Sequence, residues 1–132
     1  MKETNFNEIL KILENGNKLN LGILSHVYCE CIVEFGYSYE DNKLTLYAKG
    51  AYIPKVINEK VTFYKWAEGK MIKGEGIVKI LETREEKETG IKHIMKRQTE
   101  RQKETQIEKY IDRNEIKNMK ILEIEVEKIN IC

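Results

Sequence analysis

The sequence of 132 residues predicts a mainly β protein, a six-stranded antiparallel split β-barrel of the Greek-key type with flanking helices. Residues 27–39 alternate apolar and polar side chains, the period of a strand with one buried face. Five such runs follow one another through mostly tight connections, and a sixth ends the chain. Closure into a barrel would leave no exposed strand edges, which favours this class over an open sheet.

An amphipathic helix is expected at the start of the chain. Asn5 can cap it, and Glu8, three residues later, completes the pattern of a capping box. The helix should end at residues 14–16, where Gly16 can adopt the left-handed conformation. Its apolar residues recur at helical spacing: Phe6, Ile9, Leu10 and Leu13.

Strands are expected at 18–24, 27–39, 44–48, 60–66, 71–81 and 119–131. Residues 27–48 form a hairpin that turns at EDNK. In the fifth strand, Gly74 and Gly76 share one face, which indicates a bend or a close backbone approach. The second strand places its apolar residues on one face: Val27, Cys29, Cys31, Val33, Phe35, Tyr37 and Tyr39. We therefore expect Cys29 and Cys31 to be buried and to react slowly with thiol reagents.

Helical patterning returns between the fifth and sixth strands. Thr83 and Glu86 have the spacing of a second capping box. Ile91, Ile94 and Met95 make a narrow apolar stripe. Residues 96–106 contain no apolar side chain and are expected to be a solvated helix face or a mobile loop.

Composition limits the classes of function. Charged residues make up 34% and hydrophobic residues 41%, and the formal net charge is +1. That charge gives no electrostatic signature of a nucleic-acid or membrane-surface partner. No apolar run could span a bilayer, and no signal peptide is visible. The three cysteines, an odd number, suggest free thiols in a reducing compartment. A single cytoplasmic domain, 1–132, is predicted.

No catalytic or metal-ligating set is evident in the sequence. Cys29 and Cys31 lack the second ligand pair that zinc requires, so no metal is predicted. Neither histidine, His26 or His93, has an obvious nucleophile and carboxylate partner. GEG at 74–76 lies within a strand and is not a phosphate-binding loop.

The insert after the third strand is the best candidate for a binding site. Gly50 lets the backbone approach a ligand, and Pro54 restricts the loop. Lysines beside exposed amides can hold a phosphate, although a plain polar crossover fits the same residues. The candidate residues are Lys49, Gly50, Tyr52 and Lys55.

Five segments in order resemble the pyridoxamine 5′-phosphate oxidase-like superfamily of FMN-binding split barrels, most closely its nitroimidazole-resistance-type branch. NEILKILENGNKLNLGIL is similar to the opening helix and strand, and VEFGYSYEDNKLTLY to the second and third strands. NEKVTF is similar to the start of the fourth strand. IKGEGIVKILETREEK resembles the fifth strand with its following helix, and MKILEIEVEKI the closing strand.

The resemblance implies an FMN-dependent oxidoreductase that acts on a small molecule and is a homodimer with flavin at its two-fold interface. In this family a lysine or arginine after the third strand helps to bind the flavin phosphate, which points to Lys49 or Lys55. Tyr47 stands nearest the family's usual histidine. The usual GrK turn is shortened here, and the prolines around the second strand are missing. Two alternatives stay open: a flavin-free dimeric binding or accessory protein, and a haem-binding relative with His26 or His93 as ligand.

Overall fold

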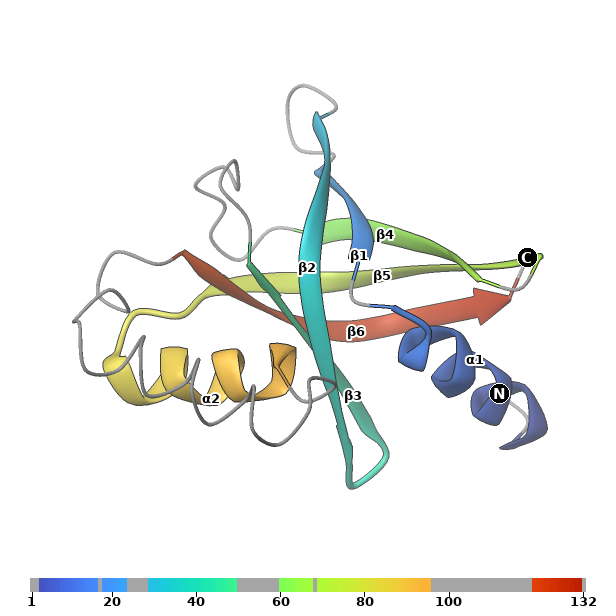
Figure 1. Ribbon diagram of the computed structural model, residues 1–132, viewed down its shortest axis with the longest axis horizontal. Helices are drawn as coiled ribbons and strands as arrows, with labels where there is room; N and C mark the ends of the chain where they lie inside the picture. The colour runs from blue at the N-terminus through green and yellow to red at the C-terminus, as the bar shows by residue number, and fades with distance from the viewer. Residues whose placement is uncertain are drawn as a thin grey trace.

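The computed structural model describes residues 3–16, 18–23, 29–49, 60–67, 69–95 and 120–131, and these form a closed six-stranded antiparallel barrel with two helices (Figure 1). The predicted fold class is confirmed. In chain order the elements are α1 (Glu3–Glu14), β1 (Lys18–Ile23), β2 (Cys29–Glu40), β3 (Lys43–Lys49), β4 (Lys60–Ala67), β5 (Lys70–Ile80), α2 (Arg84–Ile94) and β6 (Ile121–Ile131).

The strand order around the barrel is β1-β2-β3-β6-β5-β4. The first five strands, although mostly joined by short connections as expected, do not all pair with their neighbours in the chain, because β3 pairs with β6 and β4 pairs with β1. Only β2–β3 and β4–β5 are joined by turns of two residues, which force neighbouring strands to pair. Ten residues separate β3 from β4, which lets the chain cross to the other side of the barrel. The crossover leaves an edge on β3 that β6 fills.

The predicted hairpin at 27–48 is present, with a turn that explains its register. Asp41 and Asn42 both have positive φ, 53° and 62°. Two successive positive φ values define a type I′ turn, whose twist matches that of the flanking strands. The pairing Glu40↔Lys43 next to this turn sets the register in which Gly36 lies opposite Tyr47.

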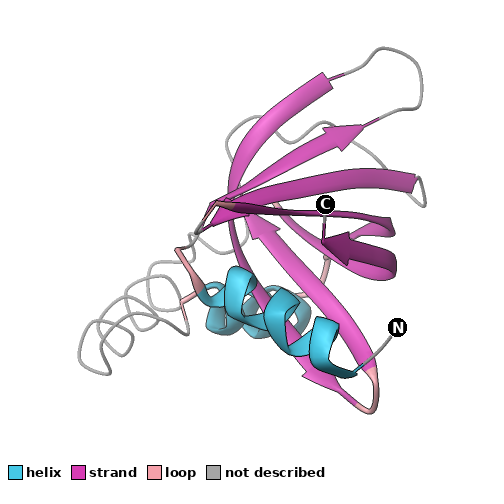
Figure 2. Cartoon of the chain, turned by 90° about the vertical axis from the view of Figure 1, so that its right-hand side faces the viewer, coloured by secondary structure: helices cyan, strands magenta, loops and turns pink. Residues whose placement is uncertain are grey.

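The inner face of the barrel and one face of α1 make the main core. Phe35, Phe63 and Leu46 are at most 1% exposed inside the barrel. Ile9 and Leu13 of α1 join them, so α1 lies across one end of the barrel (Figures 1 and 2). The helix already includes residues 3 and 4, so the expectation that Asn5 caps it is wrong. The expected left-handed end is confirmed, with φ of 80° at Gly16.

The expectation of a bend or a close backbone approach at Gly74 and Gly76 of β5 is confirmed. The β5–β6 register shifts between Glu75 and Gly76. A Cβ on Gly74 would lie 2.3 Å from the Phe63 ring, and one on Gly76 would lie 2.5 Å from the carbonyl oxygen of Glu125. Side chains at these positions would displace the core or the neighbouring strand, so glycine is required there for packing.

The second helix, α2, packs against the outside of the barrel on β2, β3 and β6 (Figure 1). Its predicted capping box is present: Thr83 Oγ1 accepts a hydrogen bond from the Glu86 amide, and Glu86 accepts one from the Thr83 amide. The predicted apolar stripe is buried in a second, smaller core. Its members are Leu81, Ile91, Ile94, Met95 and Ile121, with Tyr47 packed against them.

Several expectations concern residues that lie outside the described part of the chain. The residues concerned are His26, the insert 50–59 and the segment 96–119. For Cys29 and Cys31 the structure describes the strand positions, opposite Ile23 and Leu21, but not the side chains. Neither described helix is both long and apolar enough to cross a membrane.

Candidate functional site at the end of β3

Tyr47 lies on the outer face of β3, between Gly36 of β2 and Glu123 of β6. Alternation along β3 turns Leu46 and Ala48 into the barrel and Tyr47 toward α2. The Tyr47 ring stacks on His93 of α2, with centroids 4.7 Å apart and planes 17° from parallel. The structure therefore brings together Tyr47, a candidate for the cofactor site, and His93, a candidate haem ligand. One face of the Tyr47 ring is already covered by His93.

The surroundings of Tyr47 keep its phenol protonated. Burial raises the pKa of the Tyr47 phenol above its ordinary value of 10.0, and the negative charges of Glu123 and Glu40 raise it further. A phenolate there would lose hydration and be repelled by both carboxylates. Tyr47 is thus a neutral side chain at physiological pH and can donate a hydrogen bond.

His93 is held by its own helix as well as by the stack. Its Nδ1 lies 2.8 Å from the carbonyl oxygen of Thr89, one turn earlier in α2. In the neutral ring this contact favours the tautomer with hydrogen on Nδ1, because a carbonyl oxygen can only accept. The ring is therefore fixed in orientation against Tyr47, which is a packing role that the sequence did not indicate.

A glycine in β2 lets α2 approach the sheet closely enough for this stack. A Cβ placed on Gly36 would lie only 2.1 Å from the carbonyl oxygen of His93 and 2.5 Å from the amide nitrogen of Ile94. Any side chain at position 36 would therefore meet the backbone of α2. Because Gly36 pairs with Tyr47, the position of α2 and the orientation of Tyr47 are set by the same contact.

Lys49 is the last residue of β3 and is half-buried. Its register partners are Glu34 on β2 and Ile121 on β6. The chain enters the predicted phosphate-binding insert immediately after Lys49, so this cation lies at the base of that insert. The other candidate residues, Gly50, Tyr52 and Lys55, are outside the described residues, and their roles stay predictions.

The described core contains one charged residue, which the sequence patterns had not singled out. Lys65 of β4 points inward, is only 5% exposed, and donates a hydrogen bond of 2.9 Å from Nζ to the carbonyl oxygen of Lys18. Its Nζ lies 5.4 Å from the centre of the Phe35 ring, within range of a cation–π contact. The burial of Lys65 was predictable from the period-2 pattern of Val61, Phe63 and Lys65, because this pattern places the lysine on an inward face.

The outer face of β1, β2 and β4 carries large apolar side chains that neither helix covers. Trp66 is 62% exposed and Ile32 is 68% exposed. Asn20 of β1 pairs with Ile32 on one side and with Tyr64 on the other. The half-buried Tyr64 therefore lies between Ile32 and Trp66 on this face. Exposed tryptophan on a sheet face is more typical of an interaction surface than of a monomer surface.

The described side chains include no group of three histidine, cysteine, aspartate or glutamate residues placed to hold a metal ion. The set at the end of β3, a lysine with a neutral phenol, is instead suited to an anion that also accepts hydrogen bonds.

Known proteins resemble this chain in fold. No protein-family model and no curated protein matches the sequence. A provisionally assigned 5-nitroimidazole antibiotic resistance protein from Bacteroides thetaiotaomicron matches 95% of this chain over 81% of its own, with a TM-score of 0.62 and 18% identity. A provisionally assigned pyridoxamine 5′-phosphate oxidase from Listeria innocua matches 95% of both chains, with a TM-score of 0.58 and 18% identity.

An FAD-binding protein from Mycobacterium smegmatis matches all of this chain over 94% of its own, with a TM-score of 0.55 and 10% identity. At such identities these likenesses establish the fold alone. The chain has the split-barrel fold of pyridoxamine 5′-phosphate oxidase-like and flavin-binding proteins, and the resemblance predicted from the sequence is confirmed at that level.

Proposed function

We propose that the protein binds FMN next to the end of β3 and is a flavin-dependent oxidoreductase that acts on a small molecule. The observation that supports this most is the fold, which is shared over nearly the whole chain with an FAD-binding protein and with a provisionally assigned pyridoxamine 5′-phosphate oxidase. Lys49 at the base of the insert adds a suitably placed cation.

The flavin would supply the redox chemistry, and the chain's own residues would bind and orient it. Lys49, with Lys55 of the insert, is proposed to hold the phosphate through charge-assisted hydrogen bonds. Tyr47 is proposed to fix the end of β3, because its ring is clamped between α2 and the sheet. Gly50 would let the backbone come close to the phosphate, and Tyr52 would contact the cofactor.

Titration of FMN against single variants tests this assignment. Lys49→Ala and Lys55→Ala should each weaken FMN binding by about tenfold to a hundredfold, the value of a hydrogen bond between charged groups. Riboflavin, which lacks the phosphate, should bind both variants as it binds the wild type. The matched control is Lys43→Ala at the other end of β3, where the lysine pairs with exposed Glu125 at 3.3 Å.

Equal FMN affinity of the wild type and both variants would remove the insert from the site. Equal losses for FMN and riboflavin would indicate that the substitutions disturb the structure rather than a phosphate contact. If the wild type binds neither flavin, the protein is the flavin-free binding or accessory protein that the sequence left open.

We also propose that the protein is a symmetric dimer that covers the face around Ile32, Tyr64 and Trp66. A second copy suits this face because isologous two-fold contacts are the commonest way to bury such a surface. Light scattering should return twice the chain mass of 15.6 kDa at micromolar concentration. A monomer mass would contradict both the dimer and a flavin site between two subunits.

A further inference from the structure

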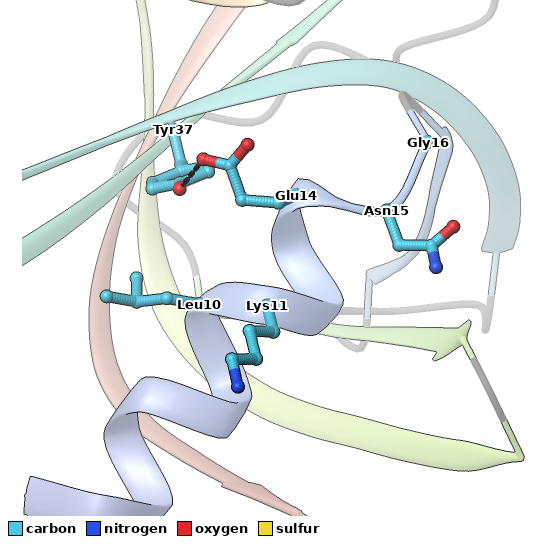
Figure 3. Close-up of a pocket in the computed structure, with 6 residues that line it drawn as sticks. All are labelled: Leu10, Lys11, Glu14, Asn15, Gly16 and Tyr37. Carbon is cyan, nitrogen blue, oxygen red and sulfur yellow. Dashed lines mark hydrogen bonds between the residues drawn. The ribbon is translucent and has the colours of Figure 1, made fainter.

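The junction between α1 and β1 contains a reactive pair of residues, Asn15 followed by Gly16 (Figure 3). It is the only place in the sequence where glycine follows asparagine. The backbone nitrogen of the residue after an asparagine can attack the asparagine side chain and close a five-membered ring. Glycine permits this attack best, because it has no side chain to crowd the nitrogen and its backbone is the most mobile.

The structure leaves both residues of this pair accessible. Asn15 and Gly16 are exposed, and α1 ends at Glu14, so Asn15 is free of the regular helical backbone that would hold the two groups apart. The hydrogen bond of 3.1 Å from Asn15 to the carbonyl oxygen of Ile12 uses the Asn15 backbone nitrogen and not its side chain. Figure 3 shows that side chain pointing away from the hydrogen-bonded pair of Glu14 and Tyr37.

The surroundings of Gly16 also leave room for the ring to form. Asn15 and Gly16 line an open groove of about 700 Å³, which water can enter. Apart from its chain neighbours, a Cβ placed on Gly16 would have one described heavy atom within 4 Å, the Lys65 Nζ at 3.7 Å. Such a distance is ordinary van der Waals contact, so nothing described there prevents the Gly16 nitrogen from moving toward Asn15.

The other asparagines in the described part of the chain lack this combination. Four of them lie within α1, β1 or β6: Asn5, Asn7, Asn20 and Asn130. Asn42 is the best internal comparison, because it is exposed and lies in a turn. However, its Oδ1 accepts a hydrogen bond of 3.3 Å from the Tyr39 hydroxyl, and the residue after it is Lys43, which pairs with Glu40 in the hairpin.

We propose that Asn15 deamidates spontaneously and that the isoaspartate formed weakens the docking of α1. The Gly16 nitrogen loses its proton and bonds to the Asn15 Cγ, and the side-chain nitrogen leaves as ammonia with that proton. Water then opens the ring. Cleavage at the main-chain carbonyl of residue 15 gives isoaspartate, and cleavage at Cγ gives aspartate. Water is the only co-reactant, and nothing is oxidised or reduced.

Isoaspartate would alter a part of the chain that is anchored on both sides. Its main chain runs through Cβ and Cγ and is therefore one methylene group longer. Leu13 before the junction and Leu19 after it are both 0% exposed, so the residues between them have to accommodate the added length. The new carboxylate also lies at the C-terminal end of α1, where negative charge is unfavourable. Both effects weaken the packing of α1 on the end of the barrel.

Incubation of the full chain at neutral to mildly alkaline pH, below its unfolding temperature, tests the chemical step. The tryptic peptide 12–18 should gain the mass that exchange of NH₂ for OH gives, and fragment ions should assign the change to Asn15 rather than Asn17. The rate should stay within about tenfold of that in the free peptide, since tenfold corresponds to about 1.4 kcal/mol of restraint on the barrier. Asn42 in the same sample should react at least about tenfold more slowly than Asn15.

Urea denaturation of the modified protein tests the structural consequence. Ion exchange, with enzymatic methylation to identify isoaspartyl groups, isolates the isoaspartate form. Its denaturation midpoint should lie below that of the fresh protein and below that of Asn15→Asp, which adds the charge without lengthening the main chain. Asn15→Gln is the matched control: its side chain is exposed and closes a ring far more slowly, so its midpoint should match the fresh wild type and stay constant on incubation.

Two results would overturn the proposal. One is a rate at Asn15 that is more than about tenfold below that of the free peptide or is no faster than the rate at Asn42. The other is an isoaspartate form with the same denaturation midpoint as the fresh protein. Neither result depends on whether flavin binds.

Discussion

Replacing Gly36 by alanine tests whether the approach of α2 to the sheet is as close as the structure shows. The new Cβ would lie 2.1 Å from the His93 carbonyl oxygen and 2.3 Å from its carbonyl carbon. Carbon and oxygen atoms in weak contact normally stay at about 3.3 Å or more, so α2 has to move by about 1 Å. The atoms in the way are backbone, so no side-chain rotation can relieve the contact.

The size of the effect follows from what holds α2 in place. Ile91, Ile94 and Met95 are buried beneath it, and each stabilises docking by about 1.5–3 kcal/mol. Their sum exceeds the usual overpacking cost of about 1–3 kcal/mol, so the helix should shift rather than detach. We expect Gly36→Ala to lower the free energy of unfolding by about 2–3 kcal/mol. In an unobstructed strand the same change would raise it by about 0.5–1 kcal/mol.

Urea denaturation of Gly36→Ala measures this loss. The matched control is Ser38→Ala, two residues further along the same face of β2 and half-buried, which should change stability by no more than about 0.5 kcal/mol. The ring proton shifts of His93 should also change in Gly36→Ala, since the Tyr47 stack depends on the same approach. A Gly36→Ala protein as stable as the wild type, with unchanged His93 shifts, would refute this packing.

Three further predictions follow from the same geometry. Burial and nearby carboxylates raise the pKa of Tyr47, so its contribution to the free energy of unfolding is present below pH 10 and is lost as the pH rises through the folded-state pKa. In urea denaturation at alkaline pH, Tyr47→Phe should therefore lose less of its free energy of unfolding than the wild type. Thr83→Ala removes the capping box of α2 and should cost about 1 kcal/mol by urea denaturation, whereas Thr83→Ser should cost little. Trp66→Ser should weaken self-association by about thirtyfold or more in dilution experiments, with Lys43→Ser as the unaffected control, and an unchanged dimer would place the interface elsewhere.

Local patterns in the sequence were enough to predict most elements of this fold. The alternation in β2, the turn at Asp41 and Asn42, and the capping box at Thr83 each depend on residues close together in the chain. The insertion of β6 between β3 and β5 was not predictable in the same way, because pairing of distant strands leaves no mark on local periodicity. The helix start was misplaced at Asn5 because a good capping residue also occurs inside helices.

The candidate site was harder to predict than the fold. The contact between Tyr47 and His93 joins residues that tertiary packing alone brings together. Gly36 did carry a usable signal, since glycine within a strand indicates a close approach, an argument applied to Gly74 and Gly76 but not to Gly36. Lys49 was expected just after the third strand and is instead its last residue, while its role as a phosphate ligand depends on a resemblance and stays a prediction.

Absorption spectroscopy of the purified protein after equilibration with FMN and gel filtration shows whether the protein binds flavin. The protein peak should keep the near-ultraviolet and visible bands of a bound flavin, at up to one flavin per chain. Retention should be lost in Lys49→Ala at low FMN concentration and kept in Lys43→Ala. A colourless wild-type peak that elutes folded and dimeric would contradict flavin binding and leave the flavin-free accessory protein. A Soret band in the protein as purified would contradict it in favour of haem.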